Sequence, residues 1–355
     1  MILFKKNIHN LLVESKKNIH LRLFLISINM ANIKKVAVLT SGGDAPGMNA
    51  AIRAVVRKAL HEGLEVMGVM RGYEGLIADD FIPMESKSVG NIIQRGGTIL
   101  KTARSERFRT IEGQQIAYDN LKKHDVDALV VIGGDGTFRG AREFTENFPF
   151  PVVGLPGTID NDLYGTDMTI GYDTALNTVV EAVDKIRDTA ASHERMFFVE
   201  VMGRDAGFIA LRSGIACGAE DVLIPETVTY LDEVHDKLVK YMTEKKTSSI
   251  ILVAEGDDAG GAYDIRNAMA KYGEEFDMRV IVLGHIQRGG SPSAYDRYLA
   301  SRLGVAAIDA LLDDQRSVMC GMVHNEIVLV PFNKTIKHHK TIDQKMLDIV
   351  DVLNS

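Results

Sequence analysis

The feature that most constrains the fold is a regular alternation of short apolar runs with helical patterns, which begins near residue 33. The first run, Val36–Leu39, has the length and composition of a buried strand, and apolar residues between Ile52 and Leu60 then recur at helical spacing. The same pattern predicts strands at 127–132, 151–155, 197–201, 221–224, 250–254 and 280–283. Strands that alternate with helices indicate an α/β protein with mainly parallel sheets.

Length and composition bound the number of domains and the partners. The chain has 355 residues, of which 46% are apolar, and an alternation over roughly 300 residues exceeds one comfortable domain. We therefore expect two doubly wound, Rossmann-like lobes of three layers each. A net charge of −7 argues against a nucleic-acid partner, and no apolar run approaches the length of a membrane span. Cys217 and Cys320 form neither a disulfide framework nor a zinc pattern, which suits the cytoplasm.

The first residues differ in character from the rest of the chain. They carry Lys5, Lys6, Lys16, Lys17 and Arg22 against Glu14. The best apolar run, Leu23–Ile26, is too short for a signal peptide. One interpretation is a targeting or lipid-contacting basic segment. We favour the other, in which residues 1–31 are an extra leader, disordered or absent from the native protein, and the functional chain begins near Met30.

Glycines or charged residues follow six of the predicted strands at the point where each strand ends. These clusters begin at Thr40, Gly133, Pro156, Met202, Glu255 and Gly284. Ligands of open α/β sheets bind at the carboxyl ends of the strands. The six clusters therefore predict a binding site there, in the cleft between the two lobes.

The segment Gly133-Gly-Asp-Gly-Thr137 is the clearest candidate for a phosphate-binding loop. Glycines let backbone N–H groups approach phosphate oxygens, and a helix start adds the positive end of a dipole. Asp135 would hold Mg²⁺, because this ion prefers a few carboxylates together with phosphate oxygens. The alternative is a tight turn with Asp135 as a helix cap. A Walker A loop and a dinucleotide fingerprint are both absent from the sequence.

The segment LPGTIDND, residues 155–162, places Asp160 and Asp162 just after a predicted strand. Phosphoryl transfer to an alcohol needs an aligned hydroxyl, an acceptor for its proton and neutralisation of the phosphoryl charge. One carboxylate can accept the proton, and the second can orient the first or reach a metal. In extended backbone, residues at i and i+2 point the same way. The alternative is an Asx turn around Asn161.

Four arginines lie near strand ends, at positions 195, 204, 279 and 288, with His285 between the last two. Arginine binds phosphate bidentately, whereas lysine does not. A solvated surface charge is the usual role of any one of them, but four arginines and a histidine on one rim favour an anionic substrate. Glu255, which ends a buried run, either accepts hydrogen bonds from sugar hydroxyls or caps the next helix.

Several segments, taken together, resemble a known family. TSGGDAPGMNAAIR, VVIGGDGT, GLPGTIDND, VEVMGR and LGHIQRGGSP, in this order and spacing, are similar to those of the bacterial ATP-dependent 6-phosphofructokinases. The resemblance runs from about Lys34 to about Leu312. The tail after Gln315 is looser, and residues 1–31 have no counterpart. NAD kinases and lipid kinases share a loop like GGDGT, whereas PGTIDND separates this chain from them.

The resemblance implies a glycolytic kinase that transfers the γ-phosphoryl group of ATP to the 1-hydroxyl of fructose 6-phosphate. It implies a cytoplasmic homotetramer with a larger ATP-binding lobe, 32–170 plus 286–336, and a smaller sugar-phosphate lobe, 171–285 plus 337–355. Asp160 would be the proton acceptor, Thr158, Asp162 and Arg204 its catalytic neighbours, and Asp135 the residue at Mg²⁺. The implied ATP contacts are Gly42, Tyr73, Arg104, Ser105, Gly134, Asp135, Gly136 and Thr137. The implied sugar-phosphate contacts are Thr158, Ile159, Asp160, Met202, Gly203, Arg204, Glu255, His285, Ile286, Gln287 and Arg288, with Arg195 and Arg279 reaching in from a neighbouring subunit.

Two glycines bear on the phosphoryl donor. Pyrophosphate-dependent members of the family carry Asp where this chain has Gly136 and Lys where it has Gly157. An Asp side chain would repel the inner phosphate of ATP, and a Lys side chain would add charge near the transferred group. Because both positions are glycine here, the resemblance implies ATP as the donor.

The family also has an effector site between subunits, which binds ADP or phosphoenolpyruvate. Arg53 and Arg57, at i and i+4 on one helix, share a face that suits a diphosphate, unless it is only a solvated face. Further matching positions are Arg187, Gly218, Glu220 and Lys246. Ser86, Glu244, Thr247 and Ser248 stand where family members tend to carry cations, so we expect blunted or altered regulation.

Three alternative functions remain. A pyrophosphate-dependent phosphofructokinase is the nearest rival. A non-catalytic sugar-phosphate sensor of the same fold would be expected to lack Asp160 or Asp135, and both are present. A dehydrogenase would need the dinucleotide fingerprint and its ribose-binding acid.

Overall fold

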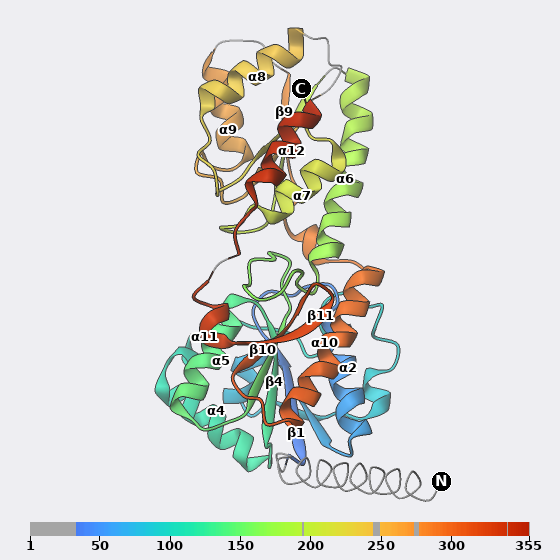
Figure 1. Cartoon of the computed structure of the whole chain (residues 1–355), viewed down its shortest axis with the longest axis vertical. Coiled ribbons are helices and arrows are strands. Elements are labelled where there is room, and N and C mark those ends of the chain that lie inside the picture. The colour runs from blue at the N-terminus through green and yellow to red at the C-terminus, as the bar shows by residue number, and fades with distance from the viewer. Residues whose placement is uncertain (1–32, 194, 244–248, 273–276, 339, 355) are drawn as a thin grey trace, which may run out of the picture.

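The computed structural model describes residues 33–193, 195–243, 249–272, 277–338 and 340–354. The predicted leader, residues 1–31, lies outside these ranges. The described strands form two sheets, and a sheet with its helices is called a lobe below. Figure 1 shows the larger lobe below the smaller one. The expectation of α/β architecture with mainly parallel sheets is confirmed.

The larger sheet has seven strands in the order β11-β10-β5-β4-β1-β2-β3. The five central strands are parallel, and the edge strands β3 and β11 pair antiparallel with their neighbours. The strands are β1 (Lys35–Thr40), β2 (Glu65–Val69), β3 (Phe81–Pro83), β4 (Ala128–Gly133), β5 (Val152–Pro156), β10 (Val318–Val323) and β11 (Glu326–Pro331). The sequence pattern did not predict β2, β3, β10 or β11. β3 is only three residues long and ends in proline, and β10 and β11 form a hairpin in the tail whose resemblance is looser.

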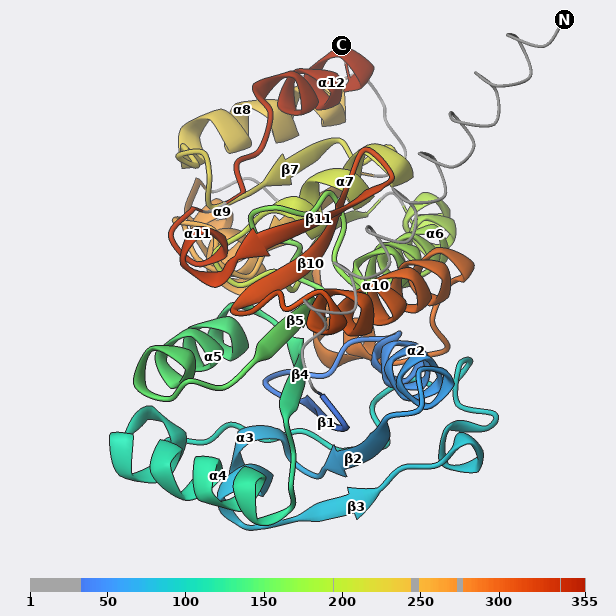
Figure 2. The ribbon, with the colours of Figure 1, turned by 60° about the horizontal axis from the view of Figure 1, so that its bottom comes forward.

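Helices cover both faces of the larger sheet because its central strands are apolar at successive positions. In β1, Val36 and Val38 pack in one core cluster, whereas Ala37 and Leu39 pack in a second. α2 (Met48–His61) and α10 (Ala294–Leu312) lie on the first face. The second face carries α3 (Gly72–Ile77), α4 (Ile111–Lys123), α5 (Asp135–Asn147) and α11 (Phe332–Thr335) (Figure 2). Burial on both faces is typical of a parallel sheet.

The smaller sheet is parallel throughout, in the order β7-β8-β6-β9. Its strands are β6 (Met196–Val201), β7 (Asp221–Leu223), β8 (Ser249–Ala254) and β9 (Met278–Val282). α8 (Leu231–Thr243) and α9 (Ala262–Met269) pack on one face. α6 (Tyr172–His193), α7 (Phe208–Cys217) and α12 (Gln344–Asn354) lie on the other. All four strands were predicted, with ends that differ by one or two residues.

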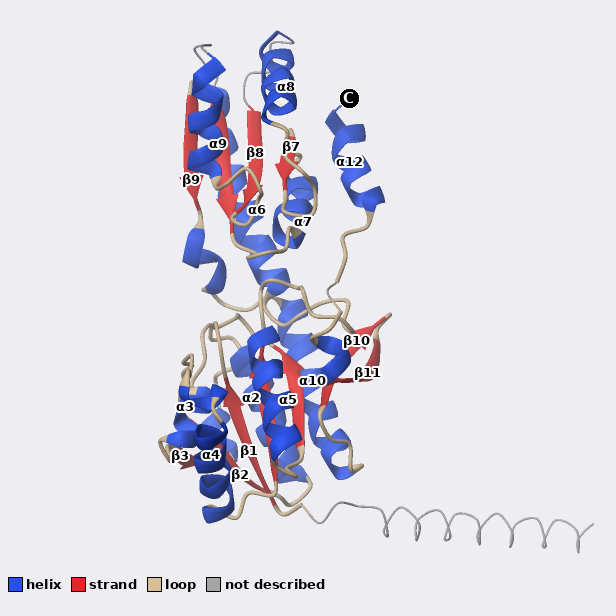
Figure 3. Ribbon diagram, turned by 90° about the vertical axis from the view of Figure 1, so that its left-hand side faces the viewer, coloured by secondary structure: helices blue, strands red, loops and turns tan. Residues whose placement is uncertain are grey.

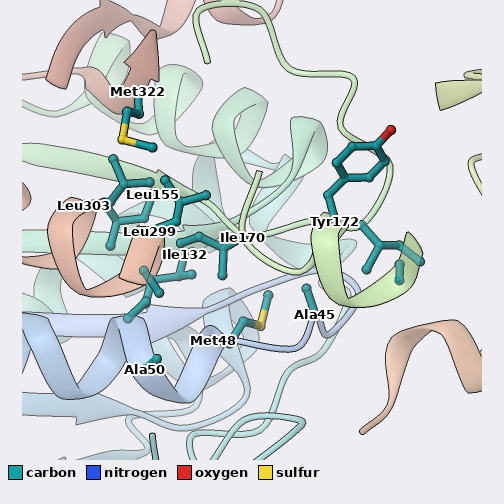
Figure 4. Close-up of a cluster of buried hydrophobic side chains, with 14 of the residues drawn as sticks. Ala45, Met48, Ala50, Ile132, Leu155, Ile170, Tyr172, Leu299, Leu303 and Met322 are labelled. Carbon is teal, nitrogen blue, oxygen red and sulfur yellow. The ribbon is translucent and has the colours of Figure 1, made fainter. Parts of the chain in front are cut away.

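One apolar cluster continues from the larger lobe into the smaller one. It includes Met48 of α2 and Leu303 of α10, and it passes through Ile170 and Tyr172 (Figure 4). From there it extends to apolar residues of α6 and α7. The Tyr172 hydroxyl donates a hydrogen bond to the Phe208 carbonyl, at 2.8 Å. The two lobes are therefore joined by packing as well as by the chain.

The chain passes between the lobes three times, at the start of α6, near the 3-10 helix Gly284–Arg288, and between α11 and α12 (Figure 1). The parallel strands of both sheets point toward this junction (Figure 3). Their carboxyl ends therefore face each other, and the polar clusters that follow these strands meet between the lobes.

Candidate functional site

The loop between β4 and α5 forms one wall of the site. Gly133 closes β4, and a Cβ there would lie 2.5 Å from the Ser41 carbonyl oxygen, so only glycine lets the ends of β1 and β4 approach this closely. The Thr137 hydroxyl donates to the same carbonyl, at 3.1 Å. Gly42, in the first loop, has a φ of 86°, and a Cβ there would meet the Thr137 hydroxyl at 3.6 Å. These contacts join the two predicted phosphate loops into one surface.

Asp135 and Gly136 occupy the first turn of α5, at the positive end of its dipole. The Asp135 carboxylate forms an ion pair with the Arg139 Nε, one helical turn away, at 2.8 Å. Gly136 is exposed, and a Cβ there would meet nothing within 4 Å. The backbone of this turn is therefore open on the side of the junction.

Tyr73 contacts the loop 133–137 on its buried side. Its hydroxyl donates to the Thr137 carbonyl at 2.6 Å, and its ring stacks on Phe108 at 4.0 Å. The side chain is buried, and burial raises its pKa. Of the other predicted ATP contacts, Ser105 donates to the Glu74 carboxylate at 2.6 Å, and Arg104 is exposed.

The loop after β5 is held by residues other than the two aspartates. Asn161 has a φ of 54°, and its Oδ1 accepts from the Thr169 backbone N–H at 2.9 Å. The Thr169 hydroxyl donates to the Thr158 carbonyl at 2.6 Å, and the Asp160 N–H donates to the Thr158 hydroxyl at 3.2 Å. The turn around Asn161 is therefore present, and the Asn161 amide and two threonine hydroxyls stabilise it.

The geometry of the aspartate pair corrects one expectation. The backbone between Asp160 and Asp162 is not extended, because Asn161 is in the left-handed region. The negative charge of Asp160 nevertheless acts on the Asp162 carboxylate. Within the described part of the chain, the Oδ1 atoms of both aspartates are buried and have no hydrogen-bond partner. Buried polar atoms are rarely left unpaired, so these oxygens point to a ligand.

Burial governs the charge of this pair. It raises the pKa of Asp160, and the positive charges of Arg204 and Arg288 oppose the rise. The pKa of Asp162 is raised to about 6 by burial and then by the negative charge of Asp160, with a smaller effect from Asp135. The negative charges of Asp160 and Asp135 therefore act unfavourably on an ionised Asp162, and a cation near these carboxylates would relieve this repulsion.

The smaller lobe contributes the loop after β6. Gly203 has a φ of 150°, and a Cβ there would lie 2.3 Å from the Ala206 carbonyl oxygen. Arg204 is itself in the left-handed region, with a φ of 55°. The Glu255 Oε1, at the end of β8, accepts from the Gly203 and Arg204 backbone N–H groups at 3.3 and 2.8 Å. Glu255 therefore shapes the loop that carries Arg204, a role that the sequence did not suggest.

The second segment that crosses between the lobes, the 3-10 helix Gly284–Arg288, also contributes to the site. Arg288 donates to the Asp44 carbonyl at 3.3 Å, and its guanidinium lies where a Cβ on Gly43 would be. Gln287 is buried, and its Oε1 accepts from the Met202 N–H at 3.3 Å. His285 and Ile286 are exposed. This helix thus connects the first loop of the larger lobe with the β6 loop of the smaller lobe.

The prediction of four arginines on one rim is wrong for a single chain. Arg204 and Arg288 lie at the carboxyl ends of the strands, but Arg195 precedes β6 and Arg279 is the second residue of β9. These two therefore lie at the amino end of the smaller sheet, where both pair with Asp277, at 2.7 and 2.9 Å. The sequence placed all four arginines near strand ends. It did not distinguish the amino ends of strands from the carboxyl ends, which lie on opposite sides of a parallel sheet.

The predicted effector residues fall into two groups. Arg187 donates to the Cys217 and Gly218 carbonyls, at 2.9 and 2.8 Å, and lies 3.5 Å from the Glu220 carboxylate. Arg53 and Arg57 lie on α2 of the larger lobe. Arg57 is exposed and donates to the Ser86 carbonyl at 3.3 Å. Lys246, Glu244, Thr247 and Ser248 lie outside the described residues.

The sequence did not identify the residues that hold the loop after β5. Asn161 was weighed only as the centre of a turn, and Thr169 was not considered. A signal for Asn161 was present, because asparagine tolerates the left-handed conformation between two acids. Thr169 gave no signal, since a hydroxyl in a loop has many ordinary roles.

Fold and site together define a two-lobed α/β protein in which a glycine-rich loop, residues 133–137, and a buried carboxylate pair lie at the junction with the loop that carries Arg204. A family model described as "Phosphofructokinase" matches residues 35–311. The chain is 57% identical over 325 residues to the ATP-dependent 6-phosphofructokinase 2 of Bacteroides thetaiotaomicron, covering 92% of this chain and 100% of that protein. It is 54% identical to the ATP-dependent 6-phosphofructokinase 1 of Thermus thermophilus, covering 90% and 99%.

Solved structures agree. Phosphofructokinase from Saccharomyces cerevisiae matches with a TM-score of 0.80 at 39% identity, over 90% of this chain and 47% of the yeast chain. A pyrophosphate-dependent phosphofructokinase from Marinobacter aquaeolei matches over 91% of this chain and 92% of that one, with a TM-score of 0.78. At 20% identity this second match shows the fold alone. The chain therefore belongs to the phosphofructokinase family.

Proposed function

We propose that the protein transfers the γ-phosphoryl group of ATP to the 1-hydroxyl of fructose 6-phosphate, giving fructose 1,6-bisphosphate and ADP in glycolysis. The observation that carries the proposal is the buried pair Asp160 and Asp162, whose Oδ1 atoms have no partner among the described residues, beside the phosphate loop and facing Arg204. The names of the two curated relatives described above, both ATP-dependent 6-phosphofructokinases, support the donor and the acceptor.

In this proposal Asp160 accepts the proton of the sugar hydroxyl, because it is the buried carboxylate that lies opposite Arg204. Thr158 and Asn161 hold its backbone, and Asp162 keeps negative charge beside it. Met202, Gly203, Arg204 and Glu255 form the wall for the sugar phosphate, with Arg288 and His285 beside it. Gly42, Gly134, Gly136 and Thr137 form the wall for the ATP phosphates, and Arg104 and Ser105 lie at its edge.

The residues present fit Mg²⁺ at Asp135. The described residues contain no group of three or more His, Cys, Asp or Glu that would hold a metal alone. Mg²⁺ does not require one, since it takes one or two carboxylates together with substrate phosphate oxygens and water. Asp135 lies at a helix start and adds to the negative field at Asp162. When bound there, the ion would neutralise phosphate charge.

The lobes and the assembly follow the same proposal. The larger lobe, 32–170 plus 286–336, would bind ATP, and the smaller lobe, 171–285 plus 337–355, the sugar phosphate. Arg195 and Arg279 lie away from the site of their own chain and share Asp277. In the proposed homotetramer they would complete the site of a neighbouring subunit. The effector site for ADP or phosphoenolpyruvate would combine Arg53 and Arg57 of one subunit with Arg187, Gly218, Glu220 and Lys246 of another.

No helix in the described ranges combines the length and the apolar character needed to cross a membrane. We propose a cytoplasmic enzyme, in keeping with its two cysteines, neither of which is in a disulfide.

The test is product formation from fructose 6-phosphate with either ATP·Mg²⁺ or pyrophosphate·Mg²⁺ as the donor. We expect turnover with ATP only. Equal turnover with pyrophosphate would remove the argument from Gly136 and Gly157, and turnover with pyrophosphate alone would establish the pyrophosphate-dependent alternative. Sugar-phosphate binding without turnover, measured by calorimetry, would establish the non-catalytic sensor instead.

A further inference from the structure

Lys340 lies on the segment that crosses between the lobes from α11 to α12 (Figure 1). It is outside residues 35–311, which match the family model. Nothing in its sequence context, Lys337-His-His-Lys340, suggests a role beyond a basic surface segment. The structure nevertheless places it against the loop that carries the two aspartates.

Lys340 contacts both sides of the junction. Its backbone N–H donates to the Asp162 carbonyl at 3.4 Å, and its ammonium donates to the Asp167 carbonyl at 2.5 Å. The same ammonium lies over the Phe208 ring, 5.3 Å from its centroid. Asp162 and Asp167 belong to the larger lobe, and Phe208 is the first residue of α7 in the smaller lobe. One side chain therefore touches the catalytic loop and the helix that follows the Arg204 loop.

Further contacts join α7 to the segment of residues 168–172 beside Lys340. The Arg212 guanidinium, one turn along α7 from Phe208, lies over the Tyr172 ring at 5.6 Å and 3.3 Å from the Met168 sulfur. Phe208 itself receives the Tyr172 hydroxyl. α7 therefore contacts Met168 and Tyr172 directly, through the Arg212 side chain and the Phe208 carbonyl. Lys340 links the Phe208 ring to the Asp167 carbonyl, which lies nearer to Asp162 in the chain.

The ammonium of Lys340 is held in an unusual environment for a lysine. Burial lowers its pKa to about 8, and the positive charge of Arg212 adds to this effect, while Asp167 and Asp162 oppose it. Lysines are rarely buried unless a specific contact holds them. The hydrogen bond to the Asp167 carbonyl is such a contact.

We propose that Lys340 is a positioning residue for phosphoryl transfer, which holds the Asp160–Asp167 loop at a fixed distance from α7 and from Arg204. The inference rests on the proposed function. It assigns a part in that function to the C-terminal crossing segment. Catalysis depends on placement at this scale, since a misplacement of about 1 Å can cost on the order of 100-fold in rate.

The test compares Lys340→Met and Lys340→Arg with Lys337→Met, a matched change at an exposed lysine three residues earlier. We expect Lys340→Met to fold and to lower kcat by roughly 10- to 100-fold, with the KM for ATP changed less than about twofold. Lys340→Arg keeps a donor for the Asp167 carbonyl and should recover most of the loss. Lys337→Met should match the wild type.

Hydrogen exchange supplies a readout that does not need activity. In Lys340→Met the contacts of the ammonium with the Asp167 carbonyl and the Phe208 ring are lost. The Thr169 and Asp167 amides should then exchange faster, because both belong to the segment that Lys340 holds. If Lys340→Met does not fold, Phe208→Leu removes the ring beneath the ammonium and should give the same fall in kcat. Wild-type kcat and unchanged exchange in a folded Lys340→Met would overturn the proposal. An inactive wild type would instead count against the proposed function.

Discussion

The Arg204 Nε lies 3.6 Å from the Asp160 Oδ2, although the two residues belong to different sheets. Asp160 is only 4% exposed, whereas the Arg204 side chain is about half exposed. The pair therefore joins a buried carboxylate to a partly exposed cation. A cation in this position favours the ionised form of Asp160, which is the form that accepts a proton.

Asp160→Asn should abolish most of the turnover while the substrates still bind. Asparagine keeps the shape of the side chain but cannot accept the sugar proton, so we expect kcat to fall by roughly 100- to 10,000-fold with KM values changed little. Steady-state kinetics with ATP and fructose 6-phosphate measure this. Asp160→Ser is a second variant for the same test. Wild-type turnover in either variant would return Asp160 to a purely structural role in the loop.

Arg204→Met should move the acid limb of the kcat/KM profile to higher pH. Burial raises the pKa of Asp160, and Arg204 is the largest influence that lowers it. Without the guanidinium the pKa rises further, so the base is lost to protonation at a higher pH than in the wild type. Arg316→Met, at an exposed position between α10 and β10, is the control. An acid limb at the same pH in Arg204→Met and the wild type would contradict the assignment.

Gly136→Asp should weaken ATP binding, whereas Gly157→Lys should lower stability. A Cβ at Gly136 meets nothing within 4 Å, so Gly136→Asp should fold normally and raise the KM for ATP by repelling its phosphates. A Cβ at Gly157 would lie 2.9 Å from the Ile132 Cγ2 and 3.2 Å from the Met48 Cε, so Gly157→Lys should cost about 1–3 kcal/mol of stability.

Thermal melting and ATP saturation curves separate these two outcomes. Gly136→Ala is the control, with an expected Tm and KM near those of the wild type. A normal KM for ATP in Gly136→Asp would show that position 136 does not face the donor phosphates.

Asp162→Asn should flatten the dependence of stability on pH. Burial and the charge of Asp160 raise the pKa of Asp162 from 3.8 to about 6 in the folded protein. Between these values the folded state binds the proton more tightly than the unfolded state, so the wild type loses stability as pH rises. The loss is complete above pH 7, on the order of 2–3 kcal/mol, and Asp162→Asn lacks it.

Urea unfolding at pH 5 and pH 8 measures this difference. From pH 5 to pH 8, the free energy of unfolding of the wild type should fall relative to that of Asp162→Asn. Asp313→Asn, at an exposed position, should show no such change relative to the wild type. A constant difference between Asp162→Asn and the wild type would mean that Asp162 is ionised at an ordinary pKa.

Regulation by ADP or phosphoenolpyruvate should be weak or altered. Arg187 is already bonded to the end of α7 and faces Glu220, and position 86 is a serine that offers its carbonyl to Arg57. We expect either effector to shift half-saturation by fructose 6-phosphate less than about fivefold, the lower end of usual allosteric coupling. Saturation curves with and without each effector measure the shift, and a large one would contradict this expectation.

The sequence by itself determined what depends on short-range pattern. The apolar runs predicted the four strands of the smaller sheet and three of the larger one, because buried parallel strands are continuously apolar. The glycine-rich loops at 133–137 and 155–162 were recognisable because backbone approach to phosphate and a carboxylate at a strand end each require particular residues within a few positions.

Only the tertiary structure decided which distant residues meet. Arg195 and Arg279 are as close to strand ends in the sequence as Arg204 and Arg288, but the direction of β6 and β9 carries them to the opposite edge. Asp160 and Arg204 are 44 positions apart and meet because both sheets turn their carboxyl ends toward one junction. Lys340 reaches the Asp167 carbonyl because the chain crosses there a third time. Such pairings follow from sheet order and chain crossings, which local periodicity does not encode.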